Sequence, residues 1–342
     1  MKTTRSSVLL FLLAAFSQAA CAQYKVTGSI PIGGTGHWDY LLADSESRRL
    51  YVSHNGEVVV VNLDTQEIVG KIKVDGFSHG IALANDLSLG FITDGDSKTS
   101  DVKSPEQVVM FNLKTLARTG TTKVGEDPDS IVFDAPSGRV FAFNGDPMQG
   151  NAIDAKTSKL DKTIELGGNP EFSVSDGRGS IFVNIKDKSE VVQIDSKTLI
   201  VKTRWPLAPC EGPSGLAMDR DNRRLFSVCS NGKIVVVDAD SGKVVATLPI
   251  GALPDGAAYD PGTKLAFSSN RDGTLTVLRQ MTKDQYTVAQ NVTTAPGART
   301  IALDTKTHTV YLSSADFGPK PPGSKYPSVL PGTFKVLVLQ MQ

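Results

Sequence analysis

Polar and ionisable side chains recur at one position along the chain, where a glycine-containing loop leads into an apolar segment. The position holds four carboxylates, one imidazole, one guanidinium and one hydroxyl: Asp39, His79, Asp129, Glu171, Ser214, Asp255 and Arg299. His37, Asp127 and Glu211 lie in the same loops. If these loops meet in space, the carboxylates repel one another unless a cation, an arginine or bound water offsets their charge. The set predicts a site for a divalent cation or a cationic ligand. The structural alternative is that these side chains cap loops or sit in a wet channel.

Motifs for a specific catalytic chemistry are lacking in the sequence. There is no C-x-x-C-H or H-E-x-x-H motif and no phosphate-binding glycine loop. The segment 94–101 (DGDSKTSD) resembles a calcium loop but lacks the glycine and glutamate of an EF-hand. His79 and Glu171 are the candidate metal ligands, and a divalent metal ion is the one cofactor that the residues suggest. No catalytic residue is assigned.

The elements that position these loops form a sequence repeat. A short apolar strand ends in Asp, a tight polar turn follows, and a basic residue leads into an aromatic-rich strand. Clear copies occupy 41–53, 131–143, 216–228, 257–269 and 301–313, and degenerate copies occupy 81–93 and 173–184. In the third to seventh copies the turn aspartates are 41 to 44 residues apart: Asp134, Asp176, Asp219, Asp260 and Asp304. A period near 42 with about four strands per unit predicts an all-β fold, a seven-bladed β-propeller with four-stranded blades.

Each copy continues into a second hairpin, seen best at 57–74, 189–207 and 233–250. Its first strand is a β-branched apolar run and its second strand alternates, as inner and outer strands of a blade should. The seventh copy has no outer strand after 334–340, and the segment 24–32 matches the missing pattern. We therefore expect an N-terminal strand to complete the last blade and close the ring, which removes exposed sheet edges.

In the expected fold most acidic residues have a structural role at turns, whereas the loop residues lie where a site could form. Asp and Asn recur at both hairpin turns, where their side chains cap backbone N–H groups. The loop residues should instead ring the mouth of the central channel. Two loops on the same face, 94–107 and 315–332, are enlarged. Long loops of this kind are often lids or binding loops, with a disordered tether as the alternative.

The repeats resemble those of the YVTN-repeat β-propellers. The segment 51–55 (YVSHN) carries the resemblance, with weaker echoes at 141–144 (FAFN) and 266–270 (AFSSN). Most blades depart from the strict motif, and the Trp-Asp and Gly-His pairs of WD40 blades do not recur in each repeat. The resemblance implies an exported bacterial propeller and little more, because functions in such families are mixed.

Two classes of function remain. The first is a binding or scaffold propeller that holds a small molecule or a periplasmic or extracellular protein on its loop-rich face, favoured by the missing catalytic motif. The alternative is a metal-assisted hydrolase or lyase, similar to propeller lactonases, with its site at the channel mouth. In that case a cation polarises a carbonyl while His79 or a carboxylate moves a proton.

The N-terminus predicts export. Lys2 and Arg5 precede nine apolar residues (8–16), and Ala20-Cys21-Ala22 fits a signal-peptidase site, so residues 1–22 are the expected signal peptide. Cleavage before Cys21 as a lipoprotein is the alternative, disfavoured by Gln18 where a lipobox has a Leu-like residue. The mature chain, 23–342, would be a single periplasmic or secreted domain and, we expect, a monomer.

The mature composition narrows the partners further. It has 34 Lys and Arg against 36 Asp and Glu, because Lys2 and Arg5 are removed, so it lacks the charge of a general nucleic-acid binder. No later stretch reaches about 18 apolar residues, so no transmembrane segment is expected. Cys210 and Cys229 would be its two cysteines, which predicts one disulfide in an oxidising compartment, with two buried thiols as the alternative.

Overall fold

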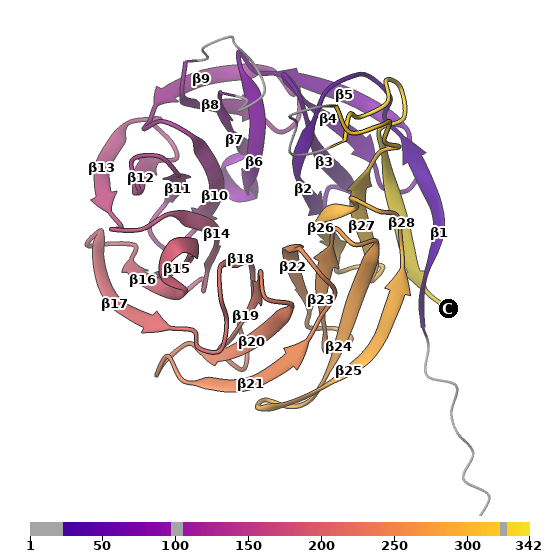
Figure 1. Ribbon diagram of the computed structural model, residues 1–342. Coiled ribbons are helices and arrows are strands. Elements are labelled where there is room, and N and C mark those ends of the chain that lie inside the picture. Colours follow the sequence, from indigo (N-terminus) through magenta and orange to yellow (C-terminus); the bar gives the residue numbers. More distant parts are fainter. Residues whose placement is uncertain (1–22, 97–104, 322–326) are drawn as a thin grey trace, which may run out of the picture.

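The computed structural model describes residues 23–96, 105–321 and 327–342. It contains seven four-stranded antiparallel sheets arranged around a central axis (Figure 1). The predicted seven-bladed β-propeller is therefore confirmed. The expected signal peptide, the alternative lipidation at Cys21, and the central parts of the two enlarged loops lie outside the described residues.

The blades follow one another along the chain, and in the first six the strands run in sequence order from the channel outwards. Blade 1 consists of β2 (Trp38–Asp44), β3 (Arg49–His54), β4 (Glu57–Asn62) and β5 (Ile68–Lys73). Blade 2 consists of β6 (Phe77–Ala84), β7 (Leu89–Gly95), β8 (Gln107–Asn112) and β9 (Arg118–Lys123). Blade 3 consists of β10 (Pro128–Asp134), β11 (Arg139–Asn144), β12 (Gln149–Asp154) and β13 (Leu160–Glu165). Blade 4 consists of β14 (Pro170–Ser175), β15 (Ser180–Ile185), β16 (Glu190–Asp195) and β17 (Ile200–Pro206). Blade 5 consists of β18 (Pro213–Asp219), β19 (Arg224–Cys229), β20 (Lys233–Asp238) and β21 (Val244–Pro249). Blade 6 consists of β22 (Pro254–Asp260), β23 (Leu265–Asn270), β24 (Thr274–Thr282) and β25 (Gln285–Thr293). Two short 3₁₀ turns, Asn85–Leu87 and Lys186–Lys188, interrupt the hairpins of blades 2 and 4.

Blade 7 joins the two ends of the described chain. It contains β26 (Arg299–Asp304), β27 (Thr309–Ser314), β28 (Lys335–Met341) and, as its outer strand, β1 (Tyr24–Pro31). β1 runs antiparallel to β28 from Tyr24 opposite Met341 to Pro31 opposite Lys335, and the two strands lie side by side in Figure 1. The expected closure of the ring by an N-terminal strand is confirmed.

The hydrophobic core is divided among the gaps between blades. Seven clusters of buried side chains are found in the described part of the chain, each drawn from two neighbouring blades. The YVTN-like segment contributes to this packing between blades. Tyr51 is buried, and its ring centroid lies 5.9 Å from that of Phe111 in blade 2. Ser53 in turn donates a hydrogen bond to the backbone oxygen of Ser78 in blade 2. The repeat signature therefore packs one blade on the next.

The recurring acidic residues cap turns, as the sequence predicts. Asp44, for example, accepts hydrogen bonds from the N–H groups of Glu46 and Ser47 at 3.1 and 3.2 Å. The same arrangement occurs at both hairpins, with the caps supplied by Asp134, Asp176, Asp219, Asp260, Asp304, Asn62, Asn112, Asp154, Asp195 and Asp238. These side chains stabilise the turns and are not part of the candidate site.

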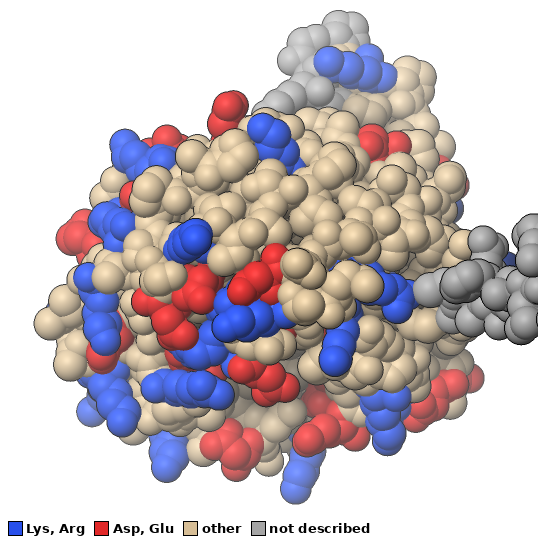
Figure 2. All heavy atoms as spheres, turned by 90° about the horizontal axis from the view of Figure 1, so that it is seen from below, with Lys and Arg blue, Asp and Glu red and all other residues tan. Residues whose placement is uncertain are grey.

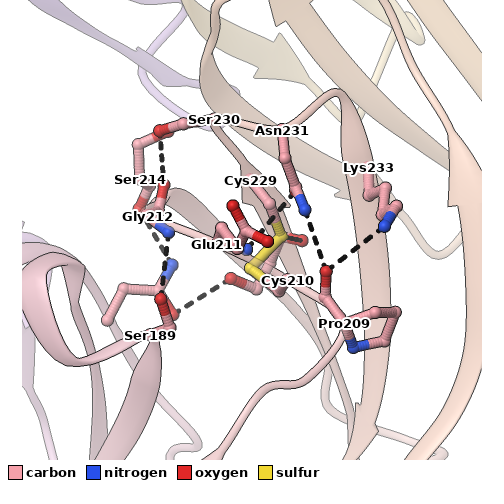
Figure 3. Close-up of a disulfide and its surroundings, with 12 residues drawn as sticks. Ser189, Pro209, Cys210, Glu211, Gly212, Ser214, Cys229, Ser230, Asn231 and Lys233 are labelled. Atoms are coloured by element: carbon pink, nitrogen blue, oxygen red, sulfur yellow. Dashed lines mark hydrogen bonds between the residues drawn. A yellow bond between two sulfur atoms is a disulfide. The ribbon is translucent and has the colours of Figure 1, made fainter.

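Cys210 and Cys229 form a disulfide, with Cα atoms 5.4 Å apart (Figure 3). Cys229 ends β19 and Cys210 lies in the loop before β18, so the bond ties that loop to its own blade. Both cysteines are buried. The predicted pairing is confirmed, and such bonds persist in oxidising compartments.

The outer wall shown in Figure 2 carries Lys and Arg intermixed with Asp and Glu. This view shows no single-sign surface of the kind that binds nucleic acid non-specifically. Within the described ranges, none of the helical segments has the length and apolar character needed to span a bilayer.

Candidate functional site

The seven residues predicted to ring the channel mouth all lie at the start of innermost strands. The sequence predicts them just before these strands, whereas the structure places them within the first three strand residues: Asp39 in β2, His79 in β6, Asp129 in β10, Glu171 in β14, Ser214 in β18, Asp255 in β22 and Arg299 in β26. The innermost strands surround the central axis in Figure 1. The ring is therefore built on the scaffold itself, not on loops.

A β-bulge at each of these positions explains how the side chains leave the regular alternation. In β2 the pairing register shifts between Trp38 and Leu41, and in β10 it shifts between Pro128 and Ile131. Corresponding shifts occur at the same place in the other five innermost strands. A bulge adds a residue that has no partner across the ladder and redirects its side chain. The seven bulges contain or adjoin the seven ring residues.

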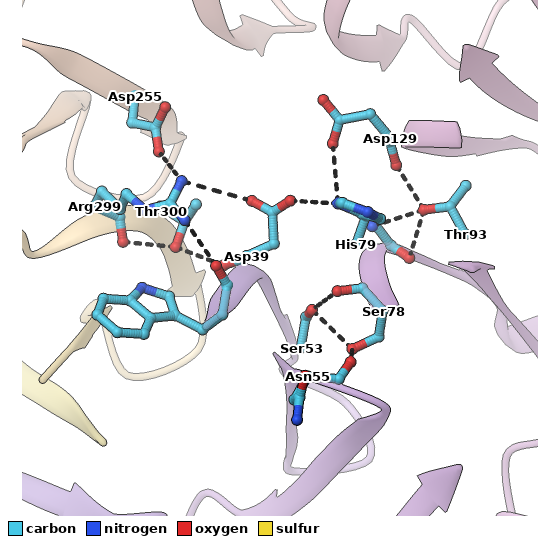
Figure 4. Close-up of polar contacts among 12 residues, drawn as sticks. Asp39, Ser53, Asn55, Ser78, His79, Thr93, Asp129, Asp255, Arg299 and Thr300 are labelled. Atoms are coloured by element: carbon cyan, nitrogen blue, oxygen red, sulfur yellow. Dashed lines mark hydrogen bonds and ion pairs between the residues drawn. The ribbon is translucent and has the colours of Figure 1, made fainter. Parts of the chain in front are cut away.

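The most tightly associated part of the ring is His79 with two carboxylates (Figure 4). Its Nδ1 lies 2.8 Å from Oδ2 of Asp39 in blade 1 and 3.9 Å from Oδ1 of Asp129 in blade 3. The three side chains are 13%, 17% and 28% exposed, respectively. One donor atom from each lies within 4.8 Å of the others, a spacing suitable for a metal ion. His79 thus bridges the blades on either side of its own.

Burial and charge act in opposite directions on these groups. Burial lowers the pKa of His79, but the hydrogen bond to Asp39 and the charges of Asp39, Asp129 and Asp127 outweigh it, so the pKa is raised. Burial raises the pKa of Asp129 well above its usual range, and the neighbouring Asp39 carboxylate adds to this shift. The cluster therefore favours a positive charge at its centre, from a proton or from a cation.

Arg299 links the cluster to blade 6. Its Nη1 lies 3.2 Å from Oδ2 of Asp255 and 3.9 Å from Oδ1 of Asp39. Its Nη2 donates to the backbone oxygen of Trp38 at 2.7 Å. Arg271 lies 3.4 Å from Asp255 on the other side. Burial opposes the ionisation of Asp255, but the two guanidinium groups outweigh it and lower its pKa.

Glu171, predicted as a metal ligand beside His79, has a cation of its own. Its Oε1 lies 2.5 Å from Nζ of Lys186. Lys186 and Arg271 are each the first residue after the second strand of their blade, so blades 4 and 6 supply cations for their own ring carboxylates. In blades 1 and 3 the equivalent residues are Asn55 and Gly145. Asp39 and Asp129 therefore share His79, whereas Asp255 and Glu171 each have a cation from their own blade.

An aromatic pair lies beside the charged ring. Tyr40 and Phe172 directly follow Asp39 and Glu171, and their rings pack with centroids 4.6 Å apart although they come from blades 1 and 4. Burial raises the pKa of Tyr40 well above its usual range, and the charges of Asp129, Asp39, Glu171 and Asp255 add to this shift. The phenol is thus within electrostatic reach of all four ring carboxylates. The pair cannot be recognised in the sequence, because both residues match the ordinary pattern of a strand.

Comparisons with known proteins place the chain among propellers. No family model matches it. It is 26% identical over 291 residues to the uncharacterized protein YncE of Salmonella typhi, covering 80% of this chain and 78% of YncE.

Solved structures with the same fold have little sequence in common with the chain. The WD40 repeats of RRP9 superpose with a TM-score of 0.77 at 7% identity, covering 94% of this chain and all of theirs. Hydrazine synthase of Kuenenia stuttgartiensis superposes with a TM-score of 0.67 at 17% identity, covering 87% of this chain and 96% of the other. Likeness at such identities shows the fold alone.

The remaining predicted residues lie around the ring. His37 is partly exposed, and burial together with Arg299 lowers its pKa. Glu211 is exposed and lies beside the disulfide in the loop before β18, with its N–H donating to Asn231 (Figure 3). His54 is buried against Phe334, with ring centroids 4.4 Å apart. Of His37, His54 and His79, only His79 belongs to the metal-type group found among the described residues.

The described ends of the Pro-rich loop 315–332 pack against the rim of blade 1. Phe317 bridges to Val329, and Gly318 donates to the backbone oxygen of Ser328 at 2.8 Å. The ring of Phe317 lies 6.1 Å from that of Trp38, whose backbone oxygen binds Arg299. The base of this loop is therefore folded onto the propeller, next to the ring.

Proposed function

We propose that this protein is an exported binding propeller whose ligand site is the channel mouth, and that the ligand carries positive charge there. One observation carries the proposal. The four ring carboxylates have three lysine or arginine side chains as ion-pair partners, Arg299, Arg271 and Lys186. Positive charge is therefore lacking at Asp39 and Asp129, which share the imidazole of His79. A positive ligand group balances this charge where water is largely excluded.

The aromatic pair beside the charged groups supports a binding site over a through-channel. Tyr40 and Phe172 pack across the channel from blades 1 and 4, so side chains close it at this level. Carboxylates beside an aromatic pair suit a cation, since aromatic faces attract positive charge. The bulges that hold the walls belong to rigid strands, which lowers the cost of organising the site.

The test is a thermal-shift panel of cations on the mature chain, residues 23–342. The panel contains divalent metal chlorides, putrescine, spermidine, choline and arginine. We expect at least one cation to raise the melting temperature saturably, and Asp129→Asn to weaken that effect at least tenfold. Glu46→Gln, on the turn at the far end of β2, is the control and should bind normally. A panel in which no shift depends on Asp129 contradicts the proposal.

A second candidate function, a metal-assisted hydrolase or lyase, is favoured by the His79 contacts specifically. An imidazole 2.8 Å from a carboxylate can take up and release a proton, and a cation in the same group would polarise a carbonyl. Hydrolysis of lactones and p-nitrophenyl esters that is lost in His79→Gln would support this candidate. Binding without turnover of either substrate class would favour the binding role.

Export and the repeat family are part of the same proposal. The disulfide and the predicted signal peptide support a periplasmic or secreted location. The similarity to YncE and the YVTN-like segment 51–55, whose first four residues are buried, support membership of the YVTN-repeat propellers. Mass spectrometry of the secreted protein tests both export and cleavage, because a mature chain beginning at Gln23 is the expected product.

A further inference from the structure

We propose that Asp39, His79 and Asp129 bind one divalent first-row metal ion, for which Zn²⁺ is the suitable probe. The inference rests on the proposed ligand site and narrows it to a specific cation and three specific donors. These donors differ from the pair expected from the sequence, His79 with Glu171, because the structure brings His79 together with Asp39 and Asp129.

The geometry of the three donors is close to that of a metal site. Zinc lies about 2.0–2.2 Å from nitrogen and carboxylate ligands, so neighbouring donors are about 3.5 Å apart. Nδ1 of His79 is 2.8 Å from Asp39 and 3.9 Å from Asp129, and all three donor atoms lie within 4.8 Å. A small rotation of the Asp129 side chain towards the ion completes the group. Three protein ligands leave a coordination position open for an external ligand.

The backbone around the donors is already fixed. Thr93 receives a hydrogen bond from the N–H of Gly80 at 2.7 Å and donates one to the backbone oxygen of Asp129 at 2.6 Å (Figure 4). These two bonds fix the spacing between Gly80, the residue after His79, and Asp129 in the next blade. Thr300 does the same for the backbone oxygen of Asp39, at 2.8 Å. Such supporting contacts hold ligands in place before the metal binds.

A second observation distinguishes this group from an ordinary acidic cluster. Oδ1 of Asp129, the oxygen that faces His79, is buried and accepts no hydrogen bond within the described residues. Buried carboxylate oxygens are normally satisfied, so a lone one aimed at a histidine points to a missing electropositive partner. The ring cations do not supply it, because Lys186 contacts Glu171 and Arg299 contacts Asp255 and Asp39.

The donor types set the class of metal. One imidazole and two carboxylates suit Zn²⁺, Mn²⁺, Fe²⁺ or Co²⁺, whereas Ca²⁺ and Mg²⁺ require mainly oxygen ligands. We therefore expect selectivity for first-row transition ions over Ca²⁺ and Mg²⁺ at this position.

The test is a calorimetric titration of EDTA-treated mature chain with ZnCl₂, followed by the absorption spectrum of the Co²⁺ form. We expect one Zn²⁺ per chain, no competition from millimolar Ca²⁺, and visible Co²⁺ bands of a low-coordinate site. Asp39→Asn and Asp129→Asn should each weaken Zn²⁺ binding by tenfold or more, as removal of a ligand does. Melting of both variants in EDTA checks that they are folded.

His308→Gln is the matched control. His308 also contacts a carboxylate through Nδ1, at 2.7 Å from Asp260, but the structure shows no third donor beside it in the described chain. This variant should keep one Zn²⁺ per chain. The proposal is overturned if both Asp variants bind Zn²⁺ as strongly as the parent protein, or if His308→Gln loses Zn²⁺ binding. It is also overturned if the parent protein does not bind Zn²⁺ at about 100 µM.

The result separates this inference from the proposed function. If Zn²⁺ does not bind but an organic cation still shifts melting through Asp129, the channel-mouth site stands and the metal assignment fails. If neither binds, both fail together.

Discussion

The rings of Tyr40 in blade 1 and Phe172 in blade 4 pack against each other across the channel, with centroids 4.6 Å apart and planes inclined by 40°. Each ring follows a ring carboxylate, Asp39 or Glu171, and each lies at a β-bulge. The bulges therefore place the carboxylates at the channel mouth and the two aromatic rings beside them, where the rings pack across the channel. The contact also joins two blades that are not neighbours in the ring.

The first prediction is that this contact stabilises the fold beyond simple burial. Aromatic pairs contribute about 0.5–1.5 kcal/mol in double-mutant cycles. We expect Tyr40→Leu and Phe172→Leu to show a coupling of that size in urea unfolding. Phe172→Leu combined with Tyr286→Leu, on the outer strand of blade 6, should be additive. A coupling near zero for the first pair would mean that the rings do not pack in solution.

The second prediction concerns the disulfide. Cys210 and Cys229 are separated by 19 residues, and closing a loop of that size stabilises a fold by roughly 3 kcal/mol on the chain-entropy model. We expect Cys210→Ala with Cys229→Ala to lower the free energy of unfolding by about that amount. Urea unfolding of the variant and of the parent, each with and without reductant, measures it. A parent protein that loses no stability on full reduction would contradict this expectation.

The third prediction is a pH dependence that comes from Asp75. Arg118 donates to both carboxylate oxygens of Asp75, at 2.8 and 2.9 Å, and Gln107 donates at 2.8 Å. The hydrogen bonds from Arg118, followed by that from Gln107, hold the pKa of Asp75 at about 2. Because this lies below the ordinary value of about 3.9, the contact stabilises the fold above pH 4 and is lost as the pH falls towards 2.

The size of this effect is limited by solvent. The side chains of Asp75 and Arg118 are 49% and 34% exposed, so we expect about 1 kcal/mol or less. Asp75→Asn should lower stability at pH 7 by up to this amount and flatten the stability curve between pH 4 and 2. Urea unfolding across that range measures both. An unchanged slope would mean that Asp75 does not titrate with folding.

The fold could be predicted because its determinants are local and repeated. The turn aspartates, such as Asp219, cap their own hairpins, and the spacing between copies reports the size of one blade. Even ring closure was visible, since the segment beginning at Tyr24 has the pattern of the strand that blade 7 lacks. The disulfide could be predicted because Cys210 and Cys229 are the two cysteines that remain in the expected exported chain.

The site could be predicted only as a set of positions. Which carboxylate meets which cation depends on side chains from different blades or hairpin ends. Lys186 forms an ion pair with Glu171, which therefore does not pair with His79. At the equivalent position blade 3 has Gly145, which offers no cation to Asp129. These are single-residue differences between equivalent positions, which a search for repeats averages out. Tyr40 was missed for another reason, since its partner Phe172 is 132 residues away along the chain and two intervening blades separate them.

The last prediction uses β1 to measure how much ring closure contributes to stability. Tyr24 is 1% exposed, its ring meets that of Phe267 edge-on at 5.2 Å, and its hydroxyl donates to the backbone oxygen of His308 at 2.7 Å. Val26, two residues along the same strand, is 41% exposed. We expect Tyr24→Ala to cost about 3 kcal/mol or more, as deletion of a buried aromatic side chain does, and Val26→Ala to cost less than about 0.5 kcal/mol.

Tyr24→Phe separates the two contributions of this residue. It keeps the ring and leaves the His308 oxygen without its donor, which should cost about 1–1.5 kcal/mol. Urea unfolding of the three variants gives the ranking, and limited proteolysis shows whether blade 7 opens first in Tyr24→Ala. If Tyr24→Ala and Val26→Ala were equally mild, β1 would be detaching before the rest of the propeller unfolds, and closure would contribute little to global stability. If the predicted ranking holds, the first strand of the described chain holds the last blade in place.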